Sequence, residues 1–138
     1  MASGRTSSDS LPNIFPCLYY RDASSAINWL AEAFGFVERL RVAGPGETII
    51  HAEMTFGLGT IMLRTARPEV GLLSPRDLPG VNQVVSIYVE DPDKHHAQAK
   101  SAGAEITQEL ASEEHARGYT ARDPEGNFWY FGTYQPGR

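Results

Sequence analysis

Residues 122–134, Arg-Asp-Pro-Glu-Gly-Asn-Phe-Trp-Tyr-Phe-Gly-Thr-Tyr, decide the fold of this chain. Asp-Pro-x-Gly-Asn is a tight turn, because Pro124 fixes φ at the second position and both Gly126 and Asn127 tolerate a positive φ. The aromatic run that follows favours a strand, with 128 and 130 facing one way and 129 and 131 the other. A strand this bulky on both faces needs a cover on each side. We expect a helix layer on one side and more sheet or a ligand on the other.

The rest of the chain supplies the neighbours of this strand. Asp22 is a good N-cap for a helix over 23–34 and Gly35 a good stop, while Asp91 and Pro92 begin a second helix that Gly103 ends. Strands are predicted over 14–20, 37–42, 48–56, 60–65, 83–89, 104–110, 118–122 and 128–134. Pro16 predicts an edge position for the first strand. The order indicates an α+β fold made of two βαβββ units.

The two units match piece by piece, which indicates a duplication. Tyr19-Tyr20-Arg21-Asp22 aligns with Tyr88-Val89-Glu90-Asp91, Gly35 with Gly103, and Gly59-Thr60 with Gly126-Asn127. We expect one domain over 11–136, with unit one at 13–66, a linker at 67–82 that contains a short turn, and unit two at 83–134. Residues 1–10 are predicted to be a disordered lead.

Composition limits the class of function. The formal net charge is −5, which argues against nucleic acid or an anionic membrane as the main partner and favours neutral or cationic ligands. Cys17 is the single cysteine and cannot form an internal disulfide, as is usual in a reducing cytoplasm. No apolar run is long enough to span a membrane. We therefore expect a cytoplasmic protein.

Two βαβββ units that close on Asp123-Pro124-Glu125-Gly126-Asn127 resemble the vicinal oxygen chelate superfamily. That superfamily includes glyoxalase I, extradiol dioxygenases, fosfomycin-resistance thiol transferases and bleomycin-resistance proteins. The resemblance covers about residues 11–136. It implies a cupped, barrel-like mixed sheet with helices outside and a ligand in the cup. It also implies a homodimer, whose cavities are lined by both chains.

The resemblance further implies where a metal would be bound. Metal-dependent members carry a His on the first strand of a unit, and here that position is Phe15 or Val84. Their Glu or Gln on the last strand falls at Tyr130 in unit two and at Met62 or Leu63 in unit one. None of these residues is a usual ligand of a divalent metal. We therefore expect no metal and no other cofactor, as in the bleomycin-resistance branch.

The leading hypothesis is a metal-independent protein that sequesters a hydrophobic or aromatic compound, including a cationic one, in an aromatic-lined cup. The predicted ligand-binding residues are Phe15, Cys17, Tyr19, Ser86, Tyr88, Phe128 and Tyr130. The competing interpretation is that these side chains fill the core, as aromatic residues of strands commonly do.

The alternative hypothesis is an enzyme, namely a glyoxalase-like lyase or isomerase, or a dioxygenase. His51 and Glu53 are two positions apart on a strand and so share a face, where Glu53 could orient His51 as a general base, with or without a divalent metal. An exposed or internally hydrogen-bonded pair is the plainer interpretation. His95 is predicted to be structural, and Arg122 to pair with Asp123 or Glu125.

Overall fold

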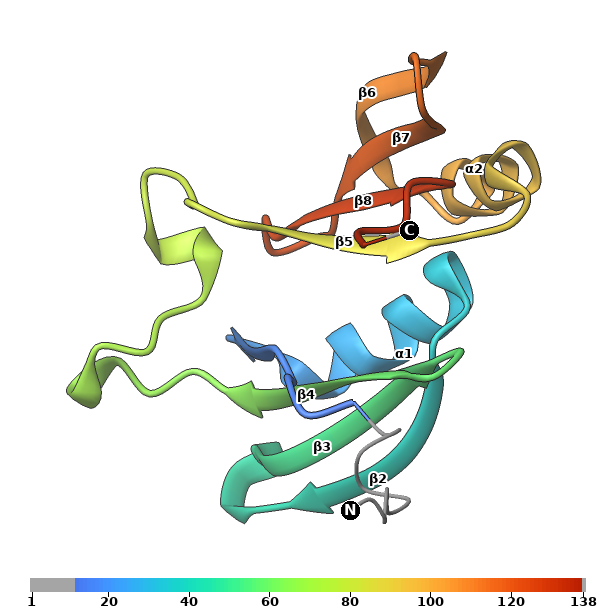
Figure 1. Cartoon of the computed structure of the whole chain (residues 1–138). Coiled ribbons are helices and arrows are strands. Elements are labelled where there is room, and N and C mark those ends of the chain that lie inside the picture. The colour runs from blue at the N-terminus through green and yellow to red at the C-terminus, as the bar shows by residue number, and fades with distance from the viewer. Residues whose placement is uncertain (1–11, 138) are drawn as a thin grey trace, which may run out of the picture.

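The computed structural model describes residues 12–137, so the predicted lead at 1–10 lies outside the described residues. Along the chain the strands and helices are β1 (Cys17–Tyr20), α1 (Ala23–Phe34), β2 (Val37–Ala43), β3 (Ile49–Phe56), β4 (Gly59–Thr65), β5 (Val84–Tyr88), α2 (Pro92–Ser101), β6 (Glu105–Ser112), β7 (Arg117–Arg122) and β8 (Phe128–Gly132) (Figure 1). Short 3-10 turns interrupt the linker at Pro68–Val70 and Pro75–Asp77. No helix among residues 12–137 is long and apolar enough to cross a membrane.

The strands form two separate four-stranded mixed sheets: sheet 1 has the strand order β1-β4-β3-β2, and sheet 2 has the order β5-β8-β7-β6. Each sheet has one parallel pair, β1 with β4 and β5 with β8, and its remaining pairs are antiparallel. The predicted α+β fold of two βαβββ units is confirmed. The two sheets are cupped and do not close into one barrel. Strand β1 is an edge strand, as Pro16 predicts.

The ends of the helices follow the sequence signals. The side chain of Asp22 accepts from the Ser25 amide, and Gly35 ends α1 with a φ of 87°. Asp91 caps α2 in the same way through the Lys94 amide. These caps satisfy amide groups that a helix N-terminus otherwise leaves without partners.

One hydrophobic core joins the two units: α1 lies between the two sheets, whereas α2 packs beside β7 and β8 with most of its residues exposed (Figure 1). Phe34, at the end of α1, packs against Trp129 and Phe131 of β8, with ring centroids 5.7 and 4.6 Å apart. Residues 128–131 alternate as the sequence predicts, with Trp129 and Phe131 buried. Each sheet therefore turns one face toward the helices and the other outward. Below we call the two faces that point away from the helices the outer faces.

Some local details differ from the sequence expectations. Strand β1 begins at Cys17 rather than at residue 14, since Pro16 has no N–H to donate to a ladder, and Phe15 therefore lies just before the strand. In the Asp-Pro-x-Gly-Asn turn only Gly126 has a positive φ, of 108°, and Asn127 has none.

Candidate functional site

The outer faces carry six of the seven side chains that the sequence nominates for ligand binding. In sheet 1, Cys17 pairs with Met62 and Tyr19 with Arg64, on the side opposite the buried Leu18 and Tyr20. In sheet 2, Ser86 pairs with Tyr130, Val84 with Phe128 and Tyr88 with Gly132. The seventh residue, Phe15, precedes β1 and is 42% exposed. These residues are exposed or half-buried, so they do not fill the core of the chain.

Tyr130 lies flat across the outer face of sheet 2, over two glycines. A Cβ at Gly118 or at Gly132 would collide with the phenol of Tyr130. Gly118 and Gly132 are cross-strand partners, and together they make the shallow seat for this ring. A pair of glycines in strands is a sequence signal for such a close approach, and the sequence interpretation did not use it.

The positions at which the superfamily places metal ligands hold no imidazole and no carboxylate. Leu63 pairs with Leu18 and is buried in the core, whereas Met62 lies on the outer face, so Met62 is the unit-one counterpart of Tyr130. Phe15 and Val84 are the residues at the positions to which the resemblance assigns the His. Among residues 12–137 no three His, Cys, Asp or Glu side chains are grouped as metal ligands. This donor set does not fit a divalent metal.

His51 and Glu53 lie on the outer face of sheet 1 and contact each other. The His51 Nε2 atom is 2.8 Å from Glu53 Oε2, and the Nε of Arg39 donates to Glu53 Oε1 at 2.7 Å. These hydrogen bonds, from His51 first and then Arg39, lower the pKa of Glu53. The carboxylate thus stays ionised and is held by two neighbours. This geometry suits a general base, His51, oriented by the Glu53 carboxylate. It equally suits a structural group of hydrogen-bonded side chains on the protein surface.

Two hollows adjoin the outer faces. The larger, of about 840 Å³, runs along the open edge of β1 and is walled on its other side by the linker. Its lining includes Cys17, Tyr19, Leu72, Leu78 and Asn127. The second, of about 470 Å³, is bordered by Ser86, Tyr88 and the β3–β4 turn. Four of the seven predicted ligand residues are thus divided between two hollows of one chain, and the other three, Phe15, Phe128 and Tyr130, line neither hollow.

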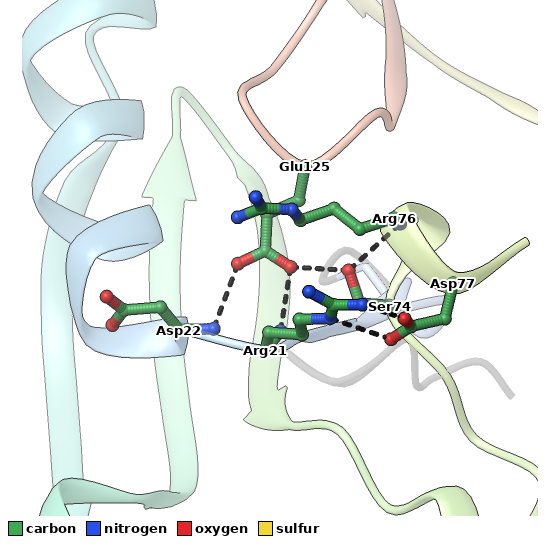
Figure 2. Close-up of polar contacts among 6 residues, drawn as sticks. All are labelled: Arg21, Asp22, Ser74, Arg76, Asp77 and Glu125. Atoms are coloured by element: carbon green, nitrogen blue, oxygen red, sulfur yellow. Dashed lines mark hydrogen bonds and ion pairs between the residues drawn. The ribbon is translucent and has the colours of Figure 1, made fainter.

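The linker that walls the larger groove is held by a buried polar junction (Figure 2). Glu125 accepts hydrogen bonds from the backbone amides of Arg21 and Asp22, at 2.7 and 2.9 Å, and from the hydroxyl of the fully buried Ser74. Arg21 also pairs with Asp77 of the linker. Glu125 thereby connects the second unit to the start of α1 and to the linker.

Asp123, two positions before Glu125, organises the turn itself. One carboxylate oxygen accepts from the Tyr20 hydroxyl at 2.7 Å and from the Trp129 indole at 3.1 Å. The other accepts from the amides of residues 125, 126 and 127. Burial, followed by the nearby Asp123 carboxylate, raises the pKa of Tyr20 well above its usual range, so Tyr20 stays protonated and donates.

The junction corrects one expectation about Arg122. Both neighbouring carboxylates have other partners, so Arg122 pairs with neither. It lies 3.8 Å from Glu105 instead, and its guanidinium is 5.4 Å from the centre of the Phe128 ring.

His95 has the structural role that the sequence predicts. Its Nε2–H donates to the backbone oxygen of Phe34 at 2.8 Å, and its Nδ1 accepts from the Tyr119 hydroxyl at 2.6 Å. Burial lowers the pKa of His95, so the ring is held neutral. His95 thus connects α2 to the end of α1 across the two units.

Comparison with known proteins places this architecture in a family. Residues 13–131 match the model of the Glyoxalase/Bleomycin resistance protein/Dioxygenase superfamily. An uncharacterized protein of Mycobacterium tuberculosis is 33% identical over 125 residues, which cover 88% of this chain and 74% of that protein. The crystal structure of TioX from Micromonospora sp. ML1 is similar at 31% identity with a TM-score of 0.69, covering 89% of this chain and 100% of that one.

A more distant likeness concerns the fold alone. The fosfomycin resistance protein FosX of Listeria monocytogenes, whose structure is a complex with Mn(II) and sulfate, superposes with a TM-score of 0.68 at 11% identity, over 91% of each chain. The duplicated βαβββ units and the family match lead to the same conclusion: this chain belongs to the glyoxalase/bleomycin resistance protein/dioxygenase superfamily.

Proposed function

We propose that this chain is a small-molecule-binding protein that acts as bleomycin-resistance proteins do, by holding a hydrophobic or aromatic compound against its outer faces. The observation that carries the proposal is the exposure of apolar and aromatic side chains on these faces. Val37 is 62% exposed, Val84 52% and Tyr88 43%. Grouped exposed side chains of this kind commonly mark a surface that a ligand or partner covers. The single cysteine fits a reducing compartment, and we place the activity in the cytoplasm.

The binding we propose needs no metal. Support comes from the side chains at the superfamily's ligand positions, which are apolar or aromatic on both sheets. Met62 and Tyr130 stand where a carboxylate would be, and each lies beside a small side chain of the neighbouring strand, Cys17 or Ser86. Such surfaces hold flat molecules by ring stacking and by burial of apolar area.

We further propose that the cup forms between two copies of the chain. The two outer faces point away from the shared core, so within one chain they cannot enclose a ligand between them. A two-fold axis would bring the outer face of sheet 1 in one copy opposite that of sheet 2 in the other. Such an isologous dimer makes two identical cups. The open edges at β1 and β5 leave room for this contact.

A second candidate function rests on the hydrogen bond between His51 and Glu53. The pair lies on the same outer face as Cys17 and Tyr19, and a base at this place would adjoin any ligand in the proposed cup. The enzyme hypothesis then requires turnover that depends on His51. Binding by sequestration requires only the aromatic face.

Calorimetric titration of chelator-treated protein tests the proposal. The panel includes 2-naphthoate, 2-naphthamide, acridine, quinoxaline and a bleomycin. We expect saturable binding of at least one of these compounds without added metal. Tyr19→Ala and Tyr88→Ala should each weaken that binding by about tenfold, because each removes a stacking surface.

Val70→Ala is the matched control, because Val70 is 55% exposed but lies in the linker, outside both outer faces. It should bind as the wild type does. Failure of the whole panel to bind would count against sequestration. Chemical conversion of a bound compound that disappears in His51→Ala would favour the enzyme.

A further inference from the structure

The outer face of sheet 1 carries more positive than negative side chains, although the chain as a whole is negative. The chain has a formal net charge of −5. The outer face of sheet 1 nevertheless holds two guanidinium groups, Arg39 and Arg64, against the single carboxylate of Glu53, with His51 as a further donor. A locally positive surface on an acidic protein attracts ligands of negative charge.

Arg64 is the unusual member of this group. Six of the eight arginines within residues 12–137 form ion pairs, namely Arg21, Arg39, Arg41, Arg67, Arg117 and Arg122. Arg76 is exposed in the linker. Arg64 is half-buried on a strand and makes no ion pair or side-chain hydrogen bond with any of the described residues. The guanidinium nitrogens of Arg64 are open to solvent, so they can receive an acceptor from outside the chain.

Arg41 shows what this fold does with a half-buried arginine on the opposite side of the same sheet. Its guanidinium donates to the carboxylate of Glu38, to the hydroxyl of Ser24 and to the amide oxygen of Asn28, with all distances between 2.9 and 3.0 Å. All three nitrogens of the Arg41 guanidinium therefore donate within the chain. The N–H groups of Arg64, in contrast, have no side-chain acceptor among the described residues and can bind one from a ligand.

The neighbours of Arg64 indicate what that acceptor is attached to. Tyr19 is its direct partner on β1, and Tyr19 also lines the groove along the edge of that strand. On the other side, Leu63 pairs with Ala52, so Arg64 lies next to His51 along the ladder. Glu53 already serves His51 and Arg39. The Glu53 carboxylate is therefore already hydrogen-bonded and does not pair with Arg64. A ligand carboxylate that reaches this face would meet the unpaired guanidinium of Arg64 beside the ring of Tyr19.

We propose that Arg64 is a specificity-determining residue, which receives a carboxylate group carried by the aromatic or apolar ligand while Tyr19 packs against the ligand's ring system. The guanidinium presents two parallel N–H groups that match the two oxygens of a carboxylate. This inference rests on the proposed binding function and narrows the ligand class to aromatic acids. It replaces the expectation from net charge, which favours neutral or cationic ligands.

The test uses two probes that differ only in charge, 2-naphthoate and 2-naphthamide, titrated by calorimetry at low ionic strength into metal-free protein. Wild-type protein should bind the carboxylate about tenfold more tightly than the amide. In Arg64→Gln that preference should fall to about one, through loss of carboxylate affinity and with the amide unchanged. Arg64→Lys should retain part of it, because the charge remains but the fork is lost.

Arg67→Gln is the matched control: Arg67 lies three positions further on, outside the sheet, and pairs with Glu69. It should keep the full preference. Equal affinity for the two probes in the wild type, or a preference that survives Arg64→Gln, would overturn the role of Arg64 and leave the aromatic binding site standing. Absence of binding for both probes would remove the naphthyl-binding site and this inference with it.

Discussion

The β3–β4 turn of unit one and the β7–β8 turn of unit two hold the same place in the duplicated fold and are built differently. The first is Gly57-Leu58, whose Leu58 is 89% exposed. The second carries the buried carboxylates of Asp123 and Glu125. One copy of the turn only reverses the chain, while the other also fastens the two units and the linker together. After the duplication, only the β7–β8 turn has acquired side chains that hold the two units and the linker together. That linker forms one wall of the larger groove.

The largest expected effect follows from removing the charge of Asp123. Asp123→Asn leaves a side-chain NH₂ facing donors that now need an acceptor, among them Tyr20 and Trp129. We expect a loss of about 3 kcal/mol in the free energy of unfolding, measured by urea denaturation. Leu58→Ala, in the equivalent turn, should cost less than about 0.5 kcal/mol. Similar losses of stability in the two variants would mean that the β7–β8 turn does not hold the two units together more than the β3–β4 turn does.

A smaller effect is expected at Glu125 and Ser74, which lie 51 positions apart in sequence. Glu125→Gln and Ser74→Ala should each destabilise the protein. Because they share one hydrogen bond, the double variant should lose less than the sum of the two, with a coupling of about 1 kcal/mol. Urea denaturation of the four proteins gives this cycle. Strict additivity would show that the linker is not held by this contact.

The smallest effect concerns the contact between the two helices. Because burial lowers the pKa of His95, the folded chain binds fewer protons there than the unfolded chain, in which the histidine pKa is about 6.5. The stabilisation linked to His95 is therefore complete above that pH and is lost as the pH falls below it. Between pH 7.5 and pH 5 the wild type should lose more stability than His95→Gln. Parallel pH profiles would rule out His95 as the source.

Much of this fold is readable from the sequence, because caps, turns and alternation are local. Asp22 and Gly35 mark the ends of α1, and the alternation of residues 128–131 correctly separates Trp129 from Tyr130. The same alternation places Cys17 and Tyr19 on one face. Periodicity says which side chains share a face but not what covers that face, so it could not show that the two outer faces point away from each other.

The polar junction was missed for a physical reason of the same kind. The partners of Glu125 come from residues 51 to 104 positions away, and no local pattern joins them. The available signal was the start of α1, where free amides call for an acceptor and Asp22 serves only one of them through its side chain. The free fork of Arg64 was likewise invisible, since whether an arginine is paired depends on neighbouring strands.

Complementation between two defective variants tests the central claim, that one ligand is held between sheet 1 of one copy and sheet 2 of another. Tyr19→Ala damages the first face and Tyr88→Ala the second, so each variant alone should bind a naphthyl probe weakly. Co-expressed and purified together, they should regain about a quarter of the wild-type number of sites, because half of the dimers are mixed and each mixed dimer has one intact cup. If the mixture binds no better than either variant alone, the cup is not shared between two chains.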